Sequence, residues 1–391
     1  MIKAKKLIEF FIPYGLLELK RNYLSKNMIN NFRSDFKRFI ARENSVLLIE
    51  FLDHHAENFP GLAKYLIDLG YNVDVVFSKH KGTGGARNDS SIFSHFKDKD
   101  IDKIRLFALS ETDMNLLLRS FIAAQYKHII LVTFKDNMER KQLYGVDLFK
   151  LRMVCIMHGS DVSNDYFKTN KIISVVKIDC INRKSPYVVS NHYFGEFQKK
   201  GKSKITTFFA LNTKYSIVRN INLLFEACDK LYEKEINNFM VKIIGDGIKI
   251  PEKYSNNFQD FGFQNYQNMY NVISESDFIL ALIDQASIQY TNKASGSYTL
   301  SYGFLKPIVL HKKFSDVSGF NNENSILHET NDDLSNVMEK CINMSDNDYS
   351  SLVTALEKSE KELYNTSLNN LKEVLEAPVQ YVSRDKILDN Y

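Results

Sequence analysis

The sequence lacks several features that would assign it to a functional class at once. No apolar run in its 391 residues approaches the roughly 18–20 uninterrupted residues of a membrane-spanning helix. The P-loop pattern GxxxxGK[ST], the GxSxG elbow, the HExxH helix and paired CxxC motifs are all missing, so nothing supports a P-loop NTPase, an α/β-hydrolase or a zinc peptidase. The four cysteines are widely spaced, which indicates reduced thiols in a cytosolic chain: Cys155, Cys180, Cys228 and Cys341.

What is present describes an ordinary globular protein with one unusual end. Hydrophobic residues make up 44% and charged residues 25%, and the length exceeds what a single core usually organises, so two domains are expected. Residues 1–42 contain ten Lys or Arg and three acidic residues, so this segment carries +7 and the remainder −3 of the net +4. The whole molecule is therefore not a basic nucleic-acid binder, and the basic character is local.

The basic segment 1–42 also shows helical periodicity. Leu and Phe recur there at spacings of three and four, which predicts amphipathic helices broken at Pro13-Tyr14-Gly15. Two interpretations stay open: a leader that lies on an anionic membrane surface, or helices that pack on the first domain with their charges in water. The first would make a cytoplasmic protein peripheral on the inner face of the cell membrane.

After this leader the pattern changes to alternating strands and helices. A buried strand over 46–51, a helix over 62–70 and a strand over 72–78 form the signature of a βαβ unit with a parallel sheet. Further strands are expected at 104–109, 128–134, 153–158, 172–178 and 187–190, with a helix over 111–125.

A polar, basic connector over 195–204 follows, and the alternation then restarts. Strands are expected at 205–211, 239–245, 258–263, 277–283, 307–311 and 325–329, with helices at 220–235 and 265–276 and a helical region near 331–378. The sequence therefore predicts an α/β protein with two Rossmann-like parallel-sheet domains. The predicted units are 1–42 (leader), 43–204 (N-terminal domain), 205–345 (C-terminal domain) and 346–391 (helical region).

Ligands of open parallel sheets bind beyond the carboxyl ends of the strands, so the loops that follow strands are the candidate sites. In the first domain the loop DHHAENFPG after strand 46–51 offers His54, His55 and Glu57 for acid–base or hydrogen-bonding chemistry, with Gly61 allowing close approach. The segment MHGSD places His158 and Asp161 at the end of another strand, where either could take a proton. A solvated loop and a hydrogen-bonded edge histidine are the structural alternatives.

In the second domain three segments follow strands or open helices. Arg219 precedes the helix at 220–235, where a guanidinium can bind a diphosphate in bidentate fashion. The turn Gly245-Asp246-Gly247 permits close approach of a ligand. The stretch 284–299 leads into a helix whose first turn can bind phosphate through free N–H groups and hydroxyls, although a plain helix cap is the alternative. Its candidates are Tyr290, Lys293, Ser295, Gly296, Ser297 and Thr299.

The order of these parts resembles a GT-B glycosyltransferase of the family 4-like kind found in bacterial capsule and lipopolysaccharide biosynthesis. The resemblance covers about residues 46–330 and rests on ENFPGLAKYLIDLGYNVDVV, MHGSD, VVSNHYF, SIVRNINLLFEACDKL, VKIIGDG, SESDFILALID and SGSYTLSYGFLKPIVL, taken in that order. It implies an N-terminal domain for the acceptor and a C-terminal domain for the nucleotide-sugar, with chemistry in the cleft between them.

By this likeness the residues that would bind the donor diphosphate and nucleotide are Arg219, Gly245, Asp246, Gly247, Tyr290, Lys293, Ser295, Gly296, Ser297 and Thr299. His158, Asp161 and His55 would line the reaction centre, and His54, Glu57 and Gly61 would belong to the acceptor or cleft loop. The implied partners are a nucleoside-diphosphate sugar and a glycan or lipid-linked glycan acceptor, with no nucleic acid. No cofactor and no metal are expected, because no DxD-like pair is placed to bridge a metal and a diphosphate.

The sequence departs from the family at one place. Many retaining members carry acidic residues in the loop and helix before the GxP strand, whereas this chain has Ser, Tyr and Thr there. Inverting and retaining mechanisms therefore both stay open. So do two alternatives, a polyol-phosphate transferase of the same fold and a non-catalytic GT-B module that binds glycan or scaffolds a partner.

Overall fold

The computed structural model describes most of the chain between residues 40 and 379. The described residues are 40–51, 55–78, 90–133, 143, 146, 151–157, 171–175, 192–198, 200–212, 219–245, 247–291, 293 and 295–379. Residues 1–39 of the leader and the strand expected at 187–190 lie outside them.

The first sheet contains six parallel strands in the order β3-β2-β1-β4-β5-β6. Its chain therefore changes direction across the sheet between β1 and β4, which makes this pair the topological switch point. The strand β1 is buried along its whole length, as expected for a central parallel strand covered on both faces. The strands are β1 (Ser45–Ile49), β2 (Asn72–Ser78), β3 (Ile104–Leu109), β4 (His128–Leu131), β5 (Met153–Met157) and β6 (Ile172–Ser174).

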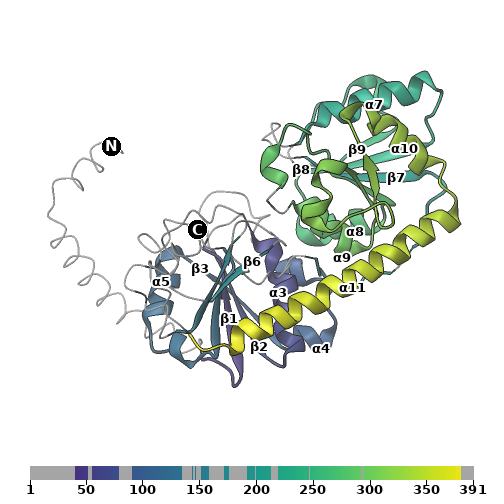
Figure 1. The fold of residues 1–391 in the computed structure, drawn as a ribbon. Coiled ribbons are helices and arrows are strands. Elements are labelled where there is room, and N and C mark those ends of the chain that lie inside the picture. Colours follow the sequence, from purple (N-terminus) through teal and green to yellow (C-terminus); the bar gives the residue numbers. More distant parts are fainter. Residues whose placement is uncertain are drawn as a thin grey trace, which may run out of the picture.

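The second sheet repeats this arrangement. Its six strands lie in the order β12-β11-β10-β7-β8-β9, which is the same relative order read from the opposite edge. The switch point here is the pair β7 and β10. The strands are β7 (Thr206–Asn212), β8 (Phe239–Gly245), β9 (Phe258–Asp260), β10 (Phe278–Leu280), β11 (Ile308–His311) and β12 (Ile326–His328). Figure 1 shows the two sheets in separate halves of the molecule, which confirms the predicted two-domain α/β fold.

Helices flank both sheets, and local sequence signals set their ends. Pro60 lies in the first turn of α3, where its missing N–H costs no hydrogen bond. Ser110 caps α5 and Asn265 caps α8 by accepting hydrogen bonds from backbone N–H groups of the first turn. The helices of the described residues are α3 (Phe59–Asp68), α4 (Asp98–Ile101), α5 (Glu111–Arg119), α7 (Ile221–Glu233), α8 (Tyr266–Ser274), α9 (Gly296–Phe304), α10 (Leu334–Ile342) and α11 (Asp346–Glu376).

Several expected elements differ in extent from the structure, among them the strand expected at 258–263, which is Phe258–Asp260, and two of the differences have a clear local cause. The helix predicted over 111–125 ends at Arg119, because Ser120 adopts an extended conformation and its hydroxyl donates to the carbonyl of Leu117. The strand predicted over 277–283 is only Phe278–Leu280, because Leu282 has a left-handed backbone (φ 50°) that ends the ladder.

The 31-residue helix α11 joins the two domains. Near its start the hydroxyl of Tyr349 donates to the carbonyl of Asp277 in the second domain (3.0 Å). Near its end the ammonium of Lys171, just before β6, donates to the carbonyls of Val374, Leu375 and Ala377. These are carbonyls that the end of a helix leaves without intrahelical partners, and a cation is also favoured there by the helix dipole. Figure 1 shows α11, in yellow, running from the second domain across to the first.

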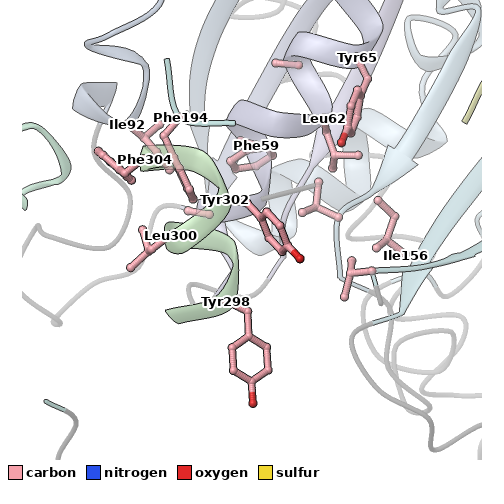
Figure 2. Close-up of a cluster of buried hydrophobic side chains, with 14 of the residues drawn as sticks. Phe59, Leu62, Tyr65, Ile92, Ile156, Phe194, Tyr298, Leu300, Tyr302 and Phe304 are labelled. Atoms are coloured by element: carbon pink, nitrogen blue, oxygen red, sulfur yellow. The ribbon is translucent and has the colours of Figure 1, made fainter. Parts of the chain in front are cut away.

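The segment 192–198 leads from the first domain to the second and packs closely on α9 through aromatic side chains. Phe194 is buried against Phe304 of α9, with ring centroids 5.5 Å apart (Figure 2). A Cβ at Gly303 would lie 2.5 Å from the carbonyl oxygen of His192. Glycine at position 303 therefore lets the connecting segment lie directly on α9.

A half-buried carboxyl group near the connecting segment, that of Glu360, has an ionisation that affects stability. Glu360 of α11 lies 3.5 Å from Nε2 of His192, which also lies 3.1 Å, through Nδ1, from the hydroxyl of Tyr65 on α3. Burial raises the pKa of Glu360 to about 7. The folded state therefore binds a proton in a pH range where the unfolded chain has lost it, and this contribution to stability falls as pH rises from about 4.5 to 7.

Replacing Glu360→Gln should remove this pH dependence. Wild type should lose on the order of 2 kcal/mol of unfolding free energy relative to Glu360→Gln between pH 5 and 8, as judged from the size of the pKa shift. Urea unfolding across that range measures the difference. Glu362→Gln, at an exposed position on the same helix, is the control and should run parallel to wild type; equal slopes for all three proteins would contradict the assignment.

Candidate functional site

The candidate site lies at the switch point of the second sheet. β7 and β10 are adjacent there, and the chain leaves the carboxyl end of each towards opposite sides. The segment after β7 ends at Arg219, directly before α7, and the segment after β10 ends at Ser295, directly before α9. This is the position at which open parallel sheets bind their ligands.

Backbone contacts hold these two segments together. Arg219 forms an isolated antiparallel bridge with Ile283, and the N–H of Asn220 donates to the carbonyl of Leu282 (3.0 Å). The side chain of Asn220 donates to Asp284 (3.0 Å), and this bond together with one from the N–H of Ala286 lowers the pKa of Asp284. The carboxylate of Asp284 thus connects the segment after β10 to the start of α7.

The guanidinium of Arg219 lies at the beginning of α9. Its Nη1 donates to the hydroxyl of Ser297 (2.8 Å), and Nη2 lies 4.0 Å from the position of a Cβ built on Gly296. Only 8% of Arg219 is exposed. Glycine at 296 therefore leaves room beside the guanidinium, and Ser297 orients it.

Within the described residues Arg219 has no carboxylate partner. Its hydrogen bond to Ser297 is the one that the structure records for its side chain, and burial lowers the pKa of the guanidinium, opposed only by two tyrosines, Tyr290 and Tyr298. A buried charge without a counter-ion is costly, and a guanidinium stays protonated at neutral pH. The site is therefore electrostatically prepared for an anion.

The first turn of α9 adds donors to the guanidinium. Ser295 occupies the N-cap, but its side chain makes no capping bond, and the N–H groups at the start of a helix have no intrahelical acceptors. A helix N-terminus with free donors beside an arginine suits a phosphate group. The hydroxyl of Thr299 donates to the carbonyl of Gly296 (3.0 Å), so its predicted contact with a donor stays a prediction.

The turn after β8 approaches the same edge of the sheet. Gly245 has φ +134°, and a Cβ there would lie 1.8 Å from the carbonyl oxygen of Asn212 at the end of β7, so only glycine fits. Asp260 accepts hydrogen bonds from the N–H groups of Ile248 and Gly262 (3.1 and 2.9 Å), which joins the loops after β8 and β9. Gly247 lies beside this carboxylate.

In the first domain, His55 and Glu57 form a pair at the loop before α3. Nδ1 of His55 lies 3.2 Å from the carboxylate of Glu57. Burial raises the pKa of Tyr270, on α8 in the second domain, and the charge of Glu57 raises it further. Gly61 is buried within the first turn of α3 and so belongs to the helix.

The structure brings together part of the predicted donor site. Arg219 is hydrogen-bonded to Ser297, Gly296 lies next to this pair, and Tyr290 interacts electrostatically with Arg219, whereas Lys293 is exposed. His54, His158, Asp161 and Asp246 lie outside the described residues, so their roles stay predictions. Sequence reasoning missed Tyr298 and Asn220, although each directly follows a residue that it had selected.

Two further observations concern metals and membranes. Over the described ranges no three His, Cys, Asp or Glu side chains gather as a metal site would require. Four candidate site residues of ligand type, His54, His158, Asp161 and Asp246, lie outside those ranges, so metal independence stays a prediction. Nor does any helix in the described part combine the length and apolarity needed to cross a bilayer.

Comparison with known proteins identifies the fold. No protein-family model matches the chain, and no curated protein matches it significantly. Among solved structures, S. aureus TarM in complex with UDP, fondaparinux and α-GlcNAc-glycerol aligns with a TM-score of 0.58 at 10% identity, covering 85% of this chain and 99% of TarM. Anabaena HepE with UDP and glucose aligns with a TM-score of 0.53 at 12% identity, covering 85% and 99%.

A glycosyltransferase from Rickettsia africae aligns with a TM-score of 0.51 at 13% identity, covering 86% of this chain and all of that one. These solved structures are glycosyltransferases of the GT-B class. Identities this low establish architecture alone. The chain therefore has the two-domain GT-B fold.

The uncompensated charge of Arg219 leads to a stability prediction. Arg219→Met keeps the length of the side chain and removes the buried charge, so it should stabilise the free protein by about 1–3 kcal/mol in urea unfolding. Arg105→Met is the matched control, because Arg105 pairs with the buried carboxylate of Asp74 and its loss should destabilise. Destabilisation of both variants to a similar degree would show that Arg219 is already neutralised.

Proposed function

We propose that the protein is a glycosyltransferase that moves a sugar from a nucleoside diphosphate to a hydroxyl group of a surface polysaccharide or lipopolysaccharide acceptor. The observation that carries the proposal is the buried guanidinium of Arg219, without a carboxylate partner in the described residues, beside the N-terminus of α9. Arg219 lies at the carboxyl ends of the strands in the second domain of the GT-B fold. A diphosphate supplies the negative charge that this arrangement lacks.

In the reaction, the bond between the anomeric carbon and the diphosphate oxygen breaks, and the acceptor oxygen forms the new glycosidic bond. The departing diphosphate takes the bonding electrons, and Arg219 with the donors of α9 stabilises its growing charge. If the configuration inverts, Asp161 or His158 takes the proton of the acceptor hydroxyl. Approach of the two domains excludes the water that would otherwise hydrolyse the donor.

The structural neighbours support a uridine nucleotide as the first donor to test. HepE was solved with UDP and glucose, and TarM with UDP and a GlcNAc-bearing compound. The loops after β8 and β9, joined through Asp260, lie at the same edge of the sheet and provide a surface for the nucleoside. The acceptor class rests on the resemblance in sequence, as does membrane attachment through residues 1–42.

A panel of donors tests the proposal. UDP-, GDP- and CDP-linked sugars are incubated with the full-length protein, with and without a glycan acceptor, and nucleotide release is measured. One donor should bind and turn over, and Arg219→Ala should reduce its turnover by at least about a hundredfold, the usual effect of removing a donor to the developing charge. Lys230→Ala, which changes a half-exposed cation of α7, is the control and should behave as wild type.

The panel also separates the alternatives. Turnover of a nucleotide-linked polyol in place of a sugar would identify a polyol-phosphate transferase. Binding without turnover would identify a non-catalytic module, which the absence of a carboxylate at positions 295–304 of α9 and its cap favours. The proposal fails if no donor binds and Arg219→Ala changes nothing.

A further inference from the structure

Two buried hydroxyl groups at the start of α9 have no hydrogen-bond partner in the described structure. They are Oγ of Ser295 and the phenol oxygen of Tyr298, and each residue is only 3% exposed. Burying a hydroxyl without a partner costs free energy, so groups of this kind call for an explanation. Both belong to the turn that the guanidinium of Arg219 contacts.

The tyrosine one turn further along α9 provides a contrast. The hydroxyl of Tyr302 donates to the carbonyl of Ser318 (2.8 Å), so its polar group is satisfied within the protein. Figure 2 shows that Tyr298 extends from the beginning of α9, away from the aromatic cluster formed by Phe194 and Phe304 at the other end. Of the two tyrosines on α9, the one without a partner for its hydroxyl is therefore at the end of the helix near Arg219.

Ser295 and Tyr298 occupy related positions in the helix. They are the N-cap and the third helical residue, a pair in which the cap hydroxyl normally accepts from the later N–H. Here the N–H of Tyr298 donates to the backbone carbonyl of Ser295 (2.9 Å), which leaves the Ser295 hydroxyl unused. Residues three apart lie on one side of a helix, so Ser295 and Tyr298 are neighbours in the first turn, which also contains Ser297, the acceptor of the hydrogen bond from Arg219.

Arg219 and Tyr298 interact electrostatically. Each residue affects the pKa of the other, and Tyr290 interacts with both. Burial nevertheless raises the pKa of Tyr298, so its phenol keeps its proton and is a hydrogen-bond donor at neutral pH. The cluster thus consists of a guanidinium and hydroxyl groups, with no carboxylate among the described residues near it.

We propose that Tyr298 and Ser295 are ligand-binding residues that donate hydrogen bonds to the phosphate oxygens of the anion held by Arg219. This inference rests on the proposed function and specifies which groups of the chain complete the site. Phosphate oxygens accept hydrogen bonds, which the guanidinium and both hydroxyls can donate, and their negative charge pairs with Arg219, whereas the neutral hydroxyls of a ribose or a sugar supply no such charge. Inorganic pyrophosphate should therefore bind, and uridine should not.

Calorimetric titration of the full-length protein with UDP, inorganic pyrophosphate and uridine tests this. Tyr298→Phe should weaken UDP and pyrophosphate about tenfold or more, because a hydrogen bond to a charged group is lost. Ser295→Ala should weaken them severalfold. Without ligand, Tyr298→Phe should melt at the same or a higher temperature than wild type, because an unsatisfied buried hydroxyl is removed.

Tyr302→Phe is the matched control, since it makes the same chemical change one turn away. It breaks a satisfied hydrogen bond, so it should lower the melting temperature of the free protein and leave UDP affinity unchanged. A purely structural role for Tyr298 predicts that the two variants behave alike, with lower melting temperatures and unchanged affinities.

The outcomes distinguish this inference from the proposed function. If Arg219→Ala abolishes UDP binding and Tyr298→Phe leaves it unchanged, the inference is wrong and the diphosphate site stands. If wild type binds neither UDP nor pyrophosphate, both are wrong. Weaker binding by Tyr298→Phe with an unchanged or raised melting temperature supports both.

Discussion

The charge of Arg219 is the constraint on which the functional interpretation depends. Most buried charges in proteins have a partner of opposite sign, and the carboxylate of Asp74 in the first domain shows that pattern with Arg42 and Arg105. Arg219 instead rests on one serine hydroxyl and a helix N-terminus. Removing this charge from water therefore lowers the stability of the free protein, and binding of an anion offsets that cost. A structural ion pair, in contrast, already contains its own counter-charge.

The fold places this charge where a substrate bound between two domains can reach it. β7 and β10 bring Arg219 to α9, while the opposite end of α9 lies against the connecting segment through Phe304 and Gly303. One nine-residue helix thus touches both the candidate anion site and the crossing between domains. α11 joins the two domains a second time, through Tyr349 at its start and Lys171 at its end.

Much of this architecture was predictable from sequence because apolar strands and helical periodicity are local signals. The two parallel sheets and the position of Arg219 before a helix follow from such patterns. Two features did not. Whether the hydroxyls of Ser295 and Tyr298 find a hydrogen-bond partner depends on which groups surround them in the folded chain. The left-handed turn at Leu282 depends on the pairing of Arg219 with Ile283. Neither feature can be predicted from the types of the residues or from their spacing.

The most direct test of the central claim is a crystal structure of the protein with UDP. The account predicts that phosphate oxygens lie within hydrogen-bonding distance of the Arg219 guanidinium and of the first turn of α9, with the nucleoside over the loops that follow β8 and β9. A structure in which UDP binds elsewhere, and the guanidinium keeps only its bond to Ser297, would contradict it.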